Sequence, residues 1–281
     1  MPLQGLALVP SMKVRDPFLP VVVIIGLAVV AAAYYYWTSR ESGEAPPREP
    51  AALSETAPSA QAEPEPEVRY PIDSIATQAR ESETAPLPPL RESDETLQAA
   101  ASELIGPETL ARFFNIKDIA RRFVVTVEAL PRRKIGNRYN LIKPVTGDFA
   151  IRGKNDDTSL SAANYSRYTS LVILAETVET EKLIRLYVRF YPLFQEEYRN
   201  LGYPKRYFND RVVEAIDDLL AAPEIEGSIK LTQPKVMYEF ADPALESLSA
   251  GRKMMIRMGP ENAAKIKAKL REIRRGLTAA R

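Results

Sequence analysis

The feature of this sequence that most restricts its fold is an uncharged run of twenty residues near the N-terminus, "FLPVVVIIGLAVVAAAYYYW" (18–37). As an α-helix, twenty residues are about 30 Å long, which is the thickness of a bilayer's hydrocarbon core. Aromatic residues end the run, and rings of this kind favour the membrane interface. We therefore predict a transmembrane helix over residues 18–37, with residues 1–17 as an N-terminal tail. Cleavage as a signal peptide is the alternative, because small residues at 31–33 follow Lys13 and Arg15.

The charges on either side of the run bear on its orientation. Lys13 and Arg15 precede it and Arg40 and Arg48 follow it, so the positive-inside count is nearly balanced. The N-terminal amine adds one cation in front, and the acidic, lysine-free sequence that follows is typical of an exported segment. We therefore predict a cytoplasmic N-terminus and an exported C-terminal part, with the reverse topology as the alternative.

Composition divides the rest of the chain into two parts. Residues 38–95 contain ten Pro and 13 Asp or Glu against five Arg, whereas residues 96–281 contain 31 Lys or Arg against 23 Asp or Glu. The first part has few large apolar residues to offset the entropy of ordering. We predict a disordered, acidic linker over residues 38–95 and a basic, soluble domain over residues 96–281. Within the linker, the apolar patch "VRYPIDSIA" (68–76) either docks on a partner or is incidental, and we favour the second interpretation.

The chain has no Cys and no His. Cys nucleophiles, Ser-His-Asp triads, imidazole bases and Cys- or His-ligated metals are therefore excluded, which leaves carboxylate or lysine chemistry and all-oxygen metal sites. The stretch "GKNDDTS" (153–159) places Asp156 and Asp157 together but lacks the spaced ligands and closing Glu of a calcium loop, so we expect a turn. We predict no cofactor, no bound metal and no enzymatic activity.

Helical periodicity dominates the predicted domain. Apolar residues recur every three or four positions over residues 116–130, 162–178, 183–201, 208–220 and 260–276. Pro131 should stop the first of these helices, and Pro192 should kink the third or begin a second piece of it. Residues 141–151 are typical of a short strand pair and residues 228–240 of an edge strand or hairpin. The expected fold class is mainly α with a small β-hairpin component, and α+β is the alternative.

Aromatic residues are concentrated in "YPLFQEEYRNLGYPKRYFNDR" (191–211). Most of them continue the apolar stripe of a helix, so we interpret them as core and not as a platform for a ligand. Gly202 stands where a left-handed C-terminal cap favours glycine, and Pro204 prevents continuation of the helix. Tyr203 and Tyr207, at the corner between two helices, remain candidate binding residues.

The C-terminal end of the chain combines an apolar seam with basic residues. Asp242 and Pro243 should begin a helix that Gly259 ends, and Pro260 should open the last helix. The seam of that helix is predicted to dock on the domain, with a basic arc beside it exposed to solvent. The arc consists of Lys267, Arg271, Arg274 and Arg275.

Two long stretches resemble domain-of-unknown-function family 3014. They are residues 191–211 and "PKVMYEFADPALESLSAGRKMMIRMGPENAAKIKAKLREIR" (234–274). The resemblance implies a bacterial protein with one N-terminal membrane span, a Pro-rich spacer and a domain in the cell envelope. With the predicted topology, it places the chain in the inner membrane and its domain in the periplasm. It implies no reaction, cofactor or catalytic residue, because none is established for the family.

Three functions are compatible with these features. We favour a non-enzymatic, membrane-anchored domain that contacts a protein or an anionic envelope polymer. Its candidate binding residues are the basic arc, the corner tyrosines and a basic loop made of Arg132, Arg133, Lys134 and Arg138. The first alternative is a carboxylate-based hydrolase of cell-wall glycan, with Glu196, Glu197, Asp210, Asp217 and Asp218 as candidates. The second is a nucleic-acid binder facing the cytoplasm, which the basic domain permits but no recognisable motif supports. The oligomeric state is not predicted.

Overall fold

The computed structural model of the protein describes residues 67–72, 86–134, 139–154 and 157–278. The predicted span at 18–37 and most of the predicted linker lie outside these residues. In the part of the chain that is described, no helix has the length and apolarity needed to cross a membrane.

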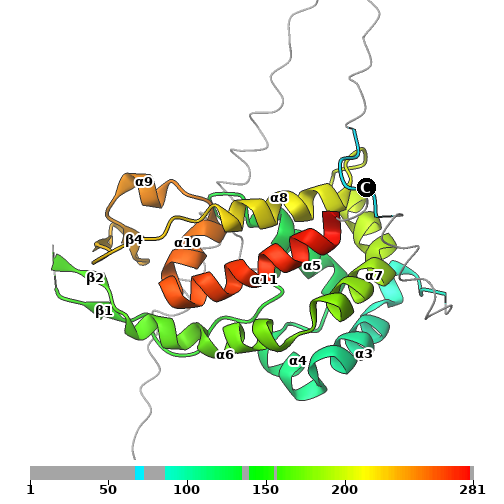
Figure 1. Ribbon diagram of the computed structural model, residues 1–281, viewed down its shortest axis with the longest axis horizontal. Helices are drawn as coiled ribbons and strands as arrows, with labels where there is room; N and C mark the ends of the chain where they lie inside the picture. The colour runs from blue at the N-terminus through cyan, green and yellow to red at the C-terminus, as the bar shows by residue number, and fades with distance from the viewer. Residues whose placement is uncertain (1–66, 73–85, 135–138, 155–156, 279–281) are drawn as a thin grey trace, which may run out of the picture. The chain divides into compact units, whose positions relative to one another are not determined.

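The described part is mainly helical with two small antiparallel hairpins, which confirms the predicted class of the folded region (Figure 1). The helices that precede the first strand are η1 (Leu90–Glu92), α3 (Asp94–Ile105), α4 (Pro107–Phe113) and α5 (Ile119–Ala129). The central helices are α6 (Ala163–Thr177), α7 (Thr180–Asn200) and α8 (Phe208–Leu220), and the last are α9 (Pro243–Glu246), α10 (Ala250–Arg257) and α11 (Pro260–Thr278). The strands are β1 (Ile151–Arg152), β2 (Ser159–Leu160), β3 (Leu231–Thr232) and β4 (Glu239–Phe240).

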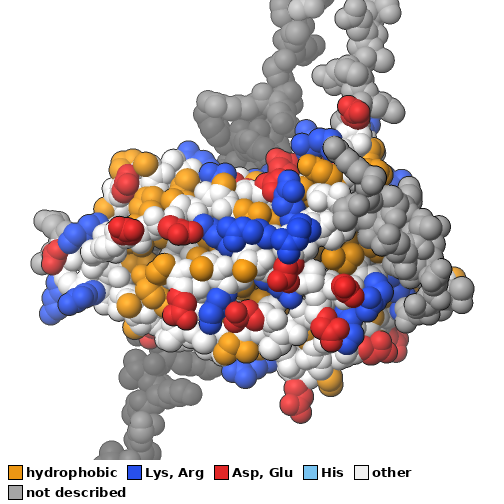
Figure 2. All heavy atoms as spheres, viewed as in Figure 1, with side chains coloured by type: hydrophobic (Ala, Val, Ile, Leu, Met, Phe, Trp, Pro, Cys, Tyr) orange, Lys and Arg blue, Asp and Glu red, His pale blue; other side chains and the backbone are white. Residues whose placement is uncertain are grey.

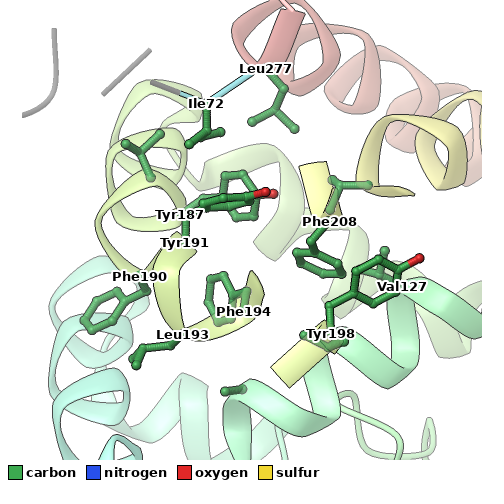
Figure 3. Close-up of a cluster of buried hydrophobic side chains, with 14 of the residues drawn as sticks. Ile72, Val127, Tyr187, Phe190, Tyr191, Leu193, Phe194, Tyr198, Phe208 and Leu277 are labelled. Atoms are coloured by element: carbon green, nitrogen blue, oxygen red, sulfur yellow. The ribbon is translucent and has the colours of Figure 1, made fainter. Parts of the chain in front are cut away.

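The main core lies where α7 meets α5, α8 and α11 (Figures 1 and 3). Its rings come largely from the aromatic stretch singled out in the sequence. Phe194 lies between Phe123 of α5 and Tyr187 of its own helix, with ring centroids 4.8 and 5.9 Å away. Phe208, at the start of α8, closes the cluster and is fully buried. The interpretation of these rings as core is therefore confirmed.

The proline and glycine of the α7 region behave differently from each other. Pro192 lies inside a single helix, so the alternative in which it begins a second piece was wrong, and the alternative in which it kinks the helix stays a prediction. Its ring lies on the exposed side of α7 and therefore displaces no core side chain. Gly202, in contrast, has φ of 108°, and the amides of Gly202 and Tyr203 donate to the carbonyls of Arg199 and Tyr198 at 3.0 and 3.3 Å. This is the predicted left-handed cap.

The two hairpins form a small second core. β3 pairs with β4 within the predicted segment 228–240. The strand pair predicted within 141–151 was wrong, because β1 pairs with β2 and Ile142 instead bridges to Phe114. Hydrogen bonds between the segments around Leu160 and Ile229 join the hairpins at one end of the described domain (Figure 1). The second core consists of Leu160, Ile229, Leu231, Phe240 and Ile256.

The helix predicted to start at Asp242 and to end at Gly259 is divided in two. The Asp242 carboxylate accepts from the Ala244 amide at 2.8 Å and caps α9. The Ser249 hydroxyl accepts from the Arg252 amide at 3.1 Å and caps α10. Ser249 therefore begins a new helix at a position where periodicity alone predicted one continuous helix. Gly259 has φ of 87° and Pro260 opens α11, as predicted.

The folded region begins before residue 96, where we had predicted the linker to end. That boundary falls inside α3, and Leu87 and Leu90 pack against the main core. Residues 67–72, from the middle of the predicted linker, also contact the domain, and Ile72 is only 5% exposed. The average composition of residues 38–95 concealed these few apolar residues, whose burial depends on a surface that the rest of the chain provides.

Candidate interaction surface

Arg132 of the predicted basic loop belongs to a polar network centred on Glu128 of α5. The Glu128 carboxylate is buried, forms an ion pair with Arg132 and lies 2.8 Å from Nε of Arg211 on α8. The hydroxyl of Tyr203 donates to the same carboxylate at 3.0 Å, and the hydroxyl of Tyr198 lies 3.4 Å from it. Burial and the negative charge of Glu128 raise the pKa of Tyr198 to about 12. Glu128 is thus the common partner of two arginines and two tyrosines of this corner.

The corner tyrosine Tyr203 therefore has a structural role in this network. Its ring stacks on that of Tyr198 with centroids 4.6 Å apart, and the Arg206 guanidinium lies 5.7 Å from its centroid. Arg133 and Lys134 are exposed beside the network, and Arg138 lies outside the described residues. The structure brings Arg132 and Tyr203 together, with their polar atoms 2.5 Å apart.

The predicted basic arc of α11 is only partly exposed. Lys267 is 5% exposed, so its predicted exposure was wrong. Its ammonium donates to the carbonyl of Ala222 at 2.8 Å and lies 3.1 Å from Glu224. The physical reason is that α11 packs beside the C-terminal end of α8, where unpaired carbonyls attract a cation.

The other members of the arc lie nearer the C-terminus of α11. Arg274 is half-buried and forms two hydrogen bonds with Asp217 of α8, at 2.5 and 3.2 Å. Arg271 and Arg275 are exposed, and no carboxylate of a described residue lies within ion-pair distance of either. The Thr180 hydroxyl lowers the pKa of the nearby Glu272, with smaller contributions from Lys269 and Arg275. Figure 2 shows a band of Lys and Arg side chains across the face that carries α8 and α11. The arc is thus reduced to two available cations on a basic face.

Tyr207, the second corner tyrosine, contacts residues 69–72. Its hydroxyl accepts a hydrogen bond from the Ile72 amide at 2.7 Å. Its neighbour Asp210 accepts from the amides of Arg69 and Tyr70 at 3.1 and 2.8 Å. The sequence indicates Asp210 only as a catalytic candidate, and it does not indicate Asn209 as a binding residue. The apolar patch at 68–76 was the one signal in the sequence that pointed to this contact.

The carboxylates considered for a hydrolase are largely engaged in structural contacts. Asp217 pairs with Arg274, and Asp218 accepts from Ser249 at 2.5 Å and lies 2.8 Å from Arg252. Burial raises the pKa of Glu197, although Arg121, 3.6 Å away, opposes the shift. Glu196 is exposed. None of these five candidates lines the depression at the turn from α6 to α7.

Two further features concern ligands. In the described ranges, no group of three or more acidic side chains is placed to hold a metal ion. Asp157 forms an ion pair with Lys230, and Asp156 lies outside the described residues. A wide, shallow depression of about 400 Å³ lies at the turn from α6 to α7, and its charged lining residues are Glu176, Glu179, Glu181, Glu272 and Lys269. Its charge disfavours an anionic ligand.

Comparison with known proteins gives one match. The family described as "Protein of unknown function (DUF3014)" matches residues 119–274, which run from the start of α5 into the last turns of α11. No curated protein matches this chain. No solved structure matches it either.

Proposed function

Starting from its membership of the DUF3014 family, to which this chain belongs, we propose that the protein is a non-enzymatic, membrane-anchored interaction protein of the bacterial cell envelope. Its helical domain binds an acidic partner, either a protein or an anionic envelope polymer, through the face that carries α8 and α11. The observation that supports this proposal best is the pair of exposed arginines, Arg271 and Arg275, one turn apart on α11.

The two arginines differ in their surroundings from the other two members of the basic arc. Lys267 and Arg274 are occupied by a helix end and by Asp217, so they stabilise the fold. Arg271 and Arg275 project from the same helix without such a partner among the described residues, and at a spacing of four they lie on one side of α11. Two cations on a rigid helix attract anionic groups without loss of backbone freedom.

The membrane anchor and the linker are the part of the proposal that rests on sequence. Residues 18–37 are long and apolar enough for one span, and the acidic linker would hold the domain away from the bilayer. A fusion of alkaline phosphatase, and separately of a fluorescent protein that matures only in the cytoplasm, after Arg281 tests the topology. Phosphatase activity without fluorescence supports an exported domain, whereas fluorescence alone refutes it.

Binding to an anionic polymer is measured with the full-length chain in detergent micelles and poly-L-glutamate as the probe. We expect weak binding whose affinity falls steeply with salt, because exposed charges are screened within about 10 Å at 0.1 M salt. Arg271→Gln with Arg275→Gln should abolish the binding and leave the unfolding midpoint unchanged. Lys182→Gln with Arg185→Gln is the matched control, because it removes the same charge from cations that already pair with Glu179 and Glu181.

Three results would contradict the proposal or change it. Binding that ignores salt, or that both double variants reduce equally, shows that α11 carries no specific site. Tighter binding of a single-stranded oligonucleotide that depends on the same two arginines, together with a cytoplasmic domain, makes the protein a nucleic-acid binder.

A further inference from the structure

Residues 69–72, here called the strap, are held through their backbone by side chains of the α8 region. Asp210 accepts two amide hydrogens, from Arg69 and Tyr70, and the Tyr207 hydroxyl accepts the amide hydrogen of Ile72. The side-chain amide of Asn209 donates to the Tyr70 carbonyl at 2.9 Å. Four backbone groups of a four-residue segment are therefore satisfied by side chains of the domain and not by a helix or a sheet.

The side chain of Ile72 anchors the strap in the main core. It is buried and lies in the same cluster as Leu277 of α11 and Tyr187 of α7 (Figure 3). Hydrogen bonds to backbone groups give affinity that does not depend on the side chains, and burial of one side chain gives selectivity. The surface that holds the strap, formed by Tyr207, Asn209, Asp210 and the buried site of Ile72, is here called the groove. It suits a peptide that adopts the bent backbone of the strap and has an apolar residue two positions after the residue bound by Asn209.

The groups that recognise the strap are positioned by α7 and not by the strap itself. The hydroxyl of Tyr187 donates to Oδ1 of Asn209 at 3.1 Å, which leaves the Asn209 amide nitrogen directed at the strap. The ring of Tyr207 lies 5.4 Å from that of Tyr191, and the Tyr191 hydroxyl donates to Gln195 at 2.8 Å. Such support holds the groove in its binding geometry.

Asn209 is the most deeply buried of the side chains that bind the strap. Its side chain is 0% exposed, and its Oδ1 already accepts from Tyr187. An unpartnered amide donor at this depth is unfavourable, and here the carbonyl of Tyr70 satisfies it.

We propose that this groove is a peptide-binding site and that the strap is its built-in ligand. The strap closes the groove in cis, and a segment of the same chemistry from elsewhere has to displace it. Because strap and groove belong to one chain, the strap acts at a high effective concentration, on the order of millimolar for short tethers. The wild-type groove is therefore closed to dilute peptides, and loss of the strap opens it.

This proposal goes beyond the binding of an acidic partner and concerns a different set of residues. It involves Tyr207, Asn209 and Asp210, whereas the acidic partner is assigned to Arg271 and Arg275. Poly-L-glutamate binding and peptide binding can therefore fail independently.

A fluorescent peptide of sequence EVRYPID, residues 67–73 with blocked ends, tests the proposal by anisotropy against the full-length chain in detergent micelles. Ile72→Asp removes the anchor of the strap and leaves every recognising group in place. We expect this variant to bind the peptide about 10- to 100-fold more tightly than the wild type, the factor that burial of one isoleucine contributes to an equilibrium. A peptide with Asp in place of Ile should not bind.

Two double variants show whether the groove is the site. Ile72→Asp with Asp210→Asn should lose at least about tenfold in peptide affinity, because Asp210 accepts two backbone hydrogens as a charged group. Ile72→Asp with Glu214→Gln makes the same chemical change one turn further along α8, at an exposed carboxylate that pairs with Arg211. It should bind like Ile72→Asp alone.

Equal peptide affinity of the wild type and Ile72→Asp, or an equal loss in both double variants, overturns the proposal. If near-UV circular dichroism shows that Ile72→Asp is unfolded, hydrogen exchange of the wild type decides instead. Excess peptide should then accelerate exchange of the amides of Arg69, Tyr70 and Ile72 while the core of α8 stays protected. No acceleration at saturating peptide shows that the strap is a fixed part of the fold.

Discussion

Replacement of Glu128 by Ala should be among the most destabilising polar changes in this domain. The Glu128 carboxylate is the shared acceptor of Arg132, Arg211 and Tyr203. The Arg211 side chain is only 11% exposed, so water cannot replace the lost carboxylate. Removal of one partner from a buried ion pair costs about 3–5 kcal/mol. Because Arg211 keeps the backbone carbonyl of residue 128 and Glu214 as partners, at 2.8 and 2.9 Å, we expect the lower end, about 3 kcal/mol.

The free energy of unfolding is measured by urea titration followed by near-UV circular dichroism, which reports on the buried tyrosines. A loss of about 3 kcal/mol corresponds to about 6–12 °C in Tm for a domain of this size. Arg132→Ala is the control, since it breaks the same network from a side chain that is 54% exposed, and it should cost at most about 1 kcal/mol. Equal losses, or a loss below about 1 kcal/mol for Glu128→Ala, would refute the argument that burial determines the strength of this network.

Three further predictions use the same assay. Phe194→Ala should cost about 3–5 kcal/mol because it empties a buried site, and an unchanged midpoint would show that the ring is not core. Gly202→Ala should cost about 1 kcal/mol, because its φ is positive but no atom lies within 4 Å of the added Cβ. Gly259→Ala should cost more, because a Cβ there would lie 2.5 Å from the Tyr165 ring. A larger loss for Gly202→Ala than for Gly259→Ala would contradict this reasoning. Burial raises the pKa of Glu197 above its ordinary value of 4.5, so the folded state holds this proton more tightly than the unfolded chain does. The contribution of Glu197 to stability is therefore full below pH 4.5 and is lost as the pH rises through the raised pKa. Glu197→Gln should remove this pH dependence and raise the unfolding midpoint at neutral pH. A variant whose stability depends on pH as strongly as that of the wild type would contradict the assignment.

The sequence by itself determined the helical class, most helix positions and two of the glycines with positive φ, Gly202 and Gly259. Periodicity located α5, α7 and α11 because the period of an apolar stripe depends only on the geometry of one helix. Gly202 and Gly259 could be placed because a left-handed cap is a local conformation that few residues adopt. The split between α9 and α10 was missed because two local signals disagree there. The spacing of the apolar residues predicts one continuous helix, whereas the Ser249 hydroxyl caps a new one.

Tertiary structure alone decided which polar groups are available. The helical wheel places Lys267 and Arg271 on one arc, but only the position of α8 buries the first and leaves the second exposed. The same holds for Ile72, which composition assigned to a linker and which the groove beside α8 covers. The physical reason is that a side chain's direction follows from its own helix, whereas its burial and pairing depend on segments far away in the sequence.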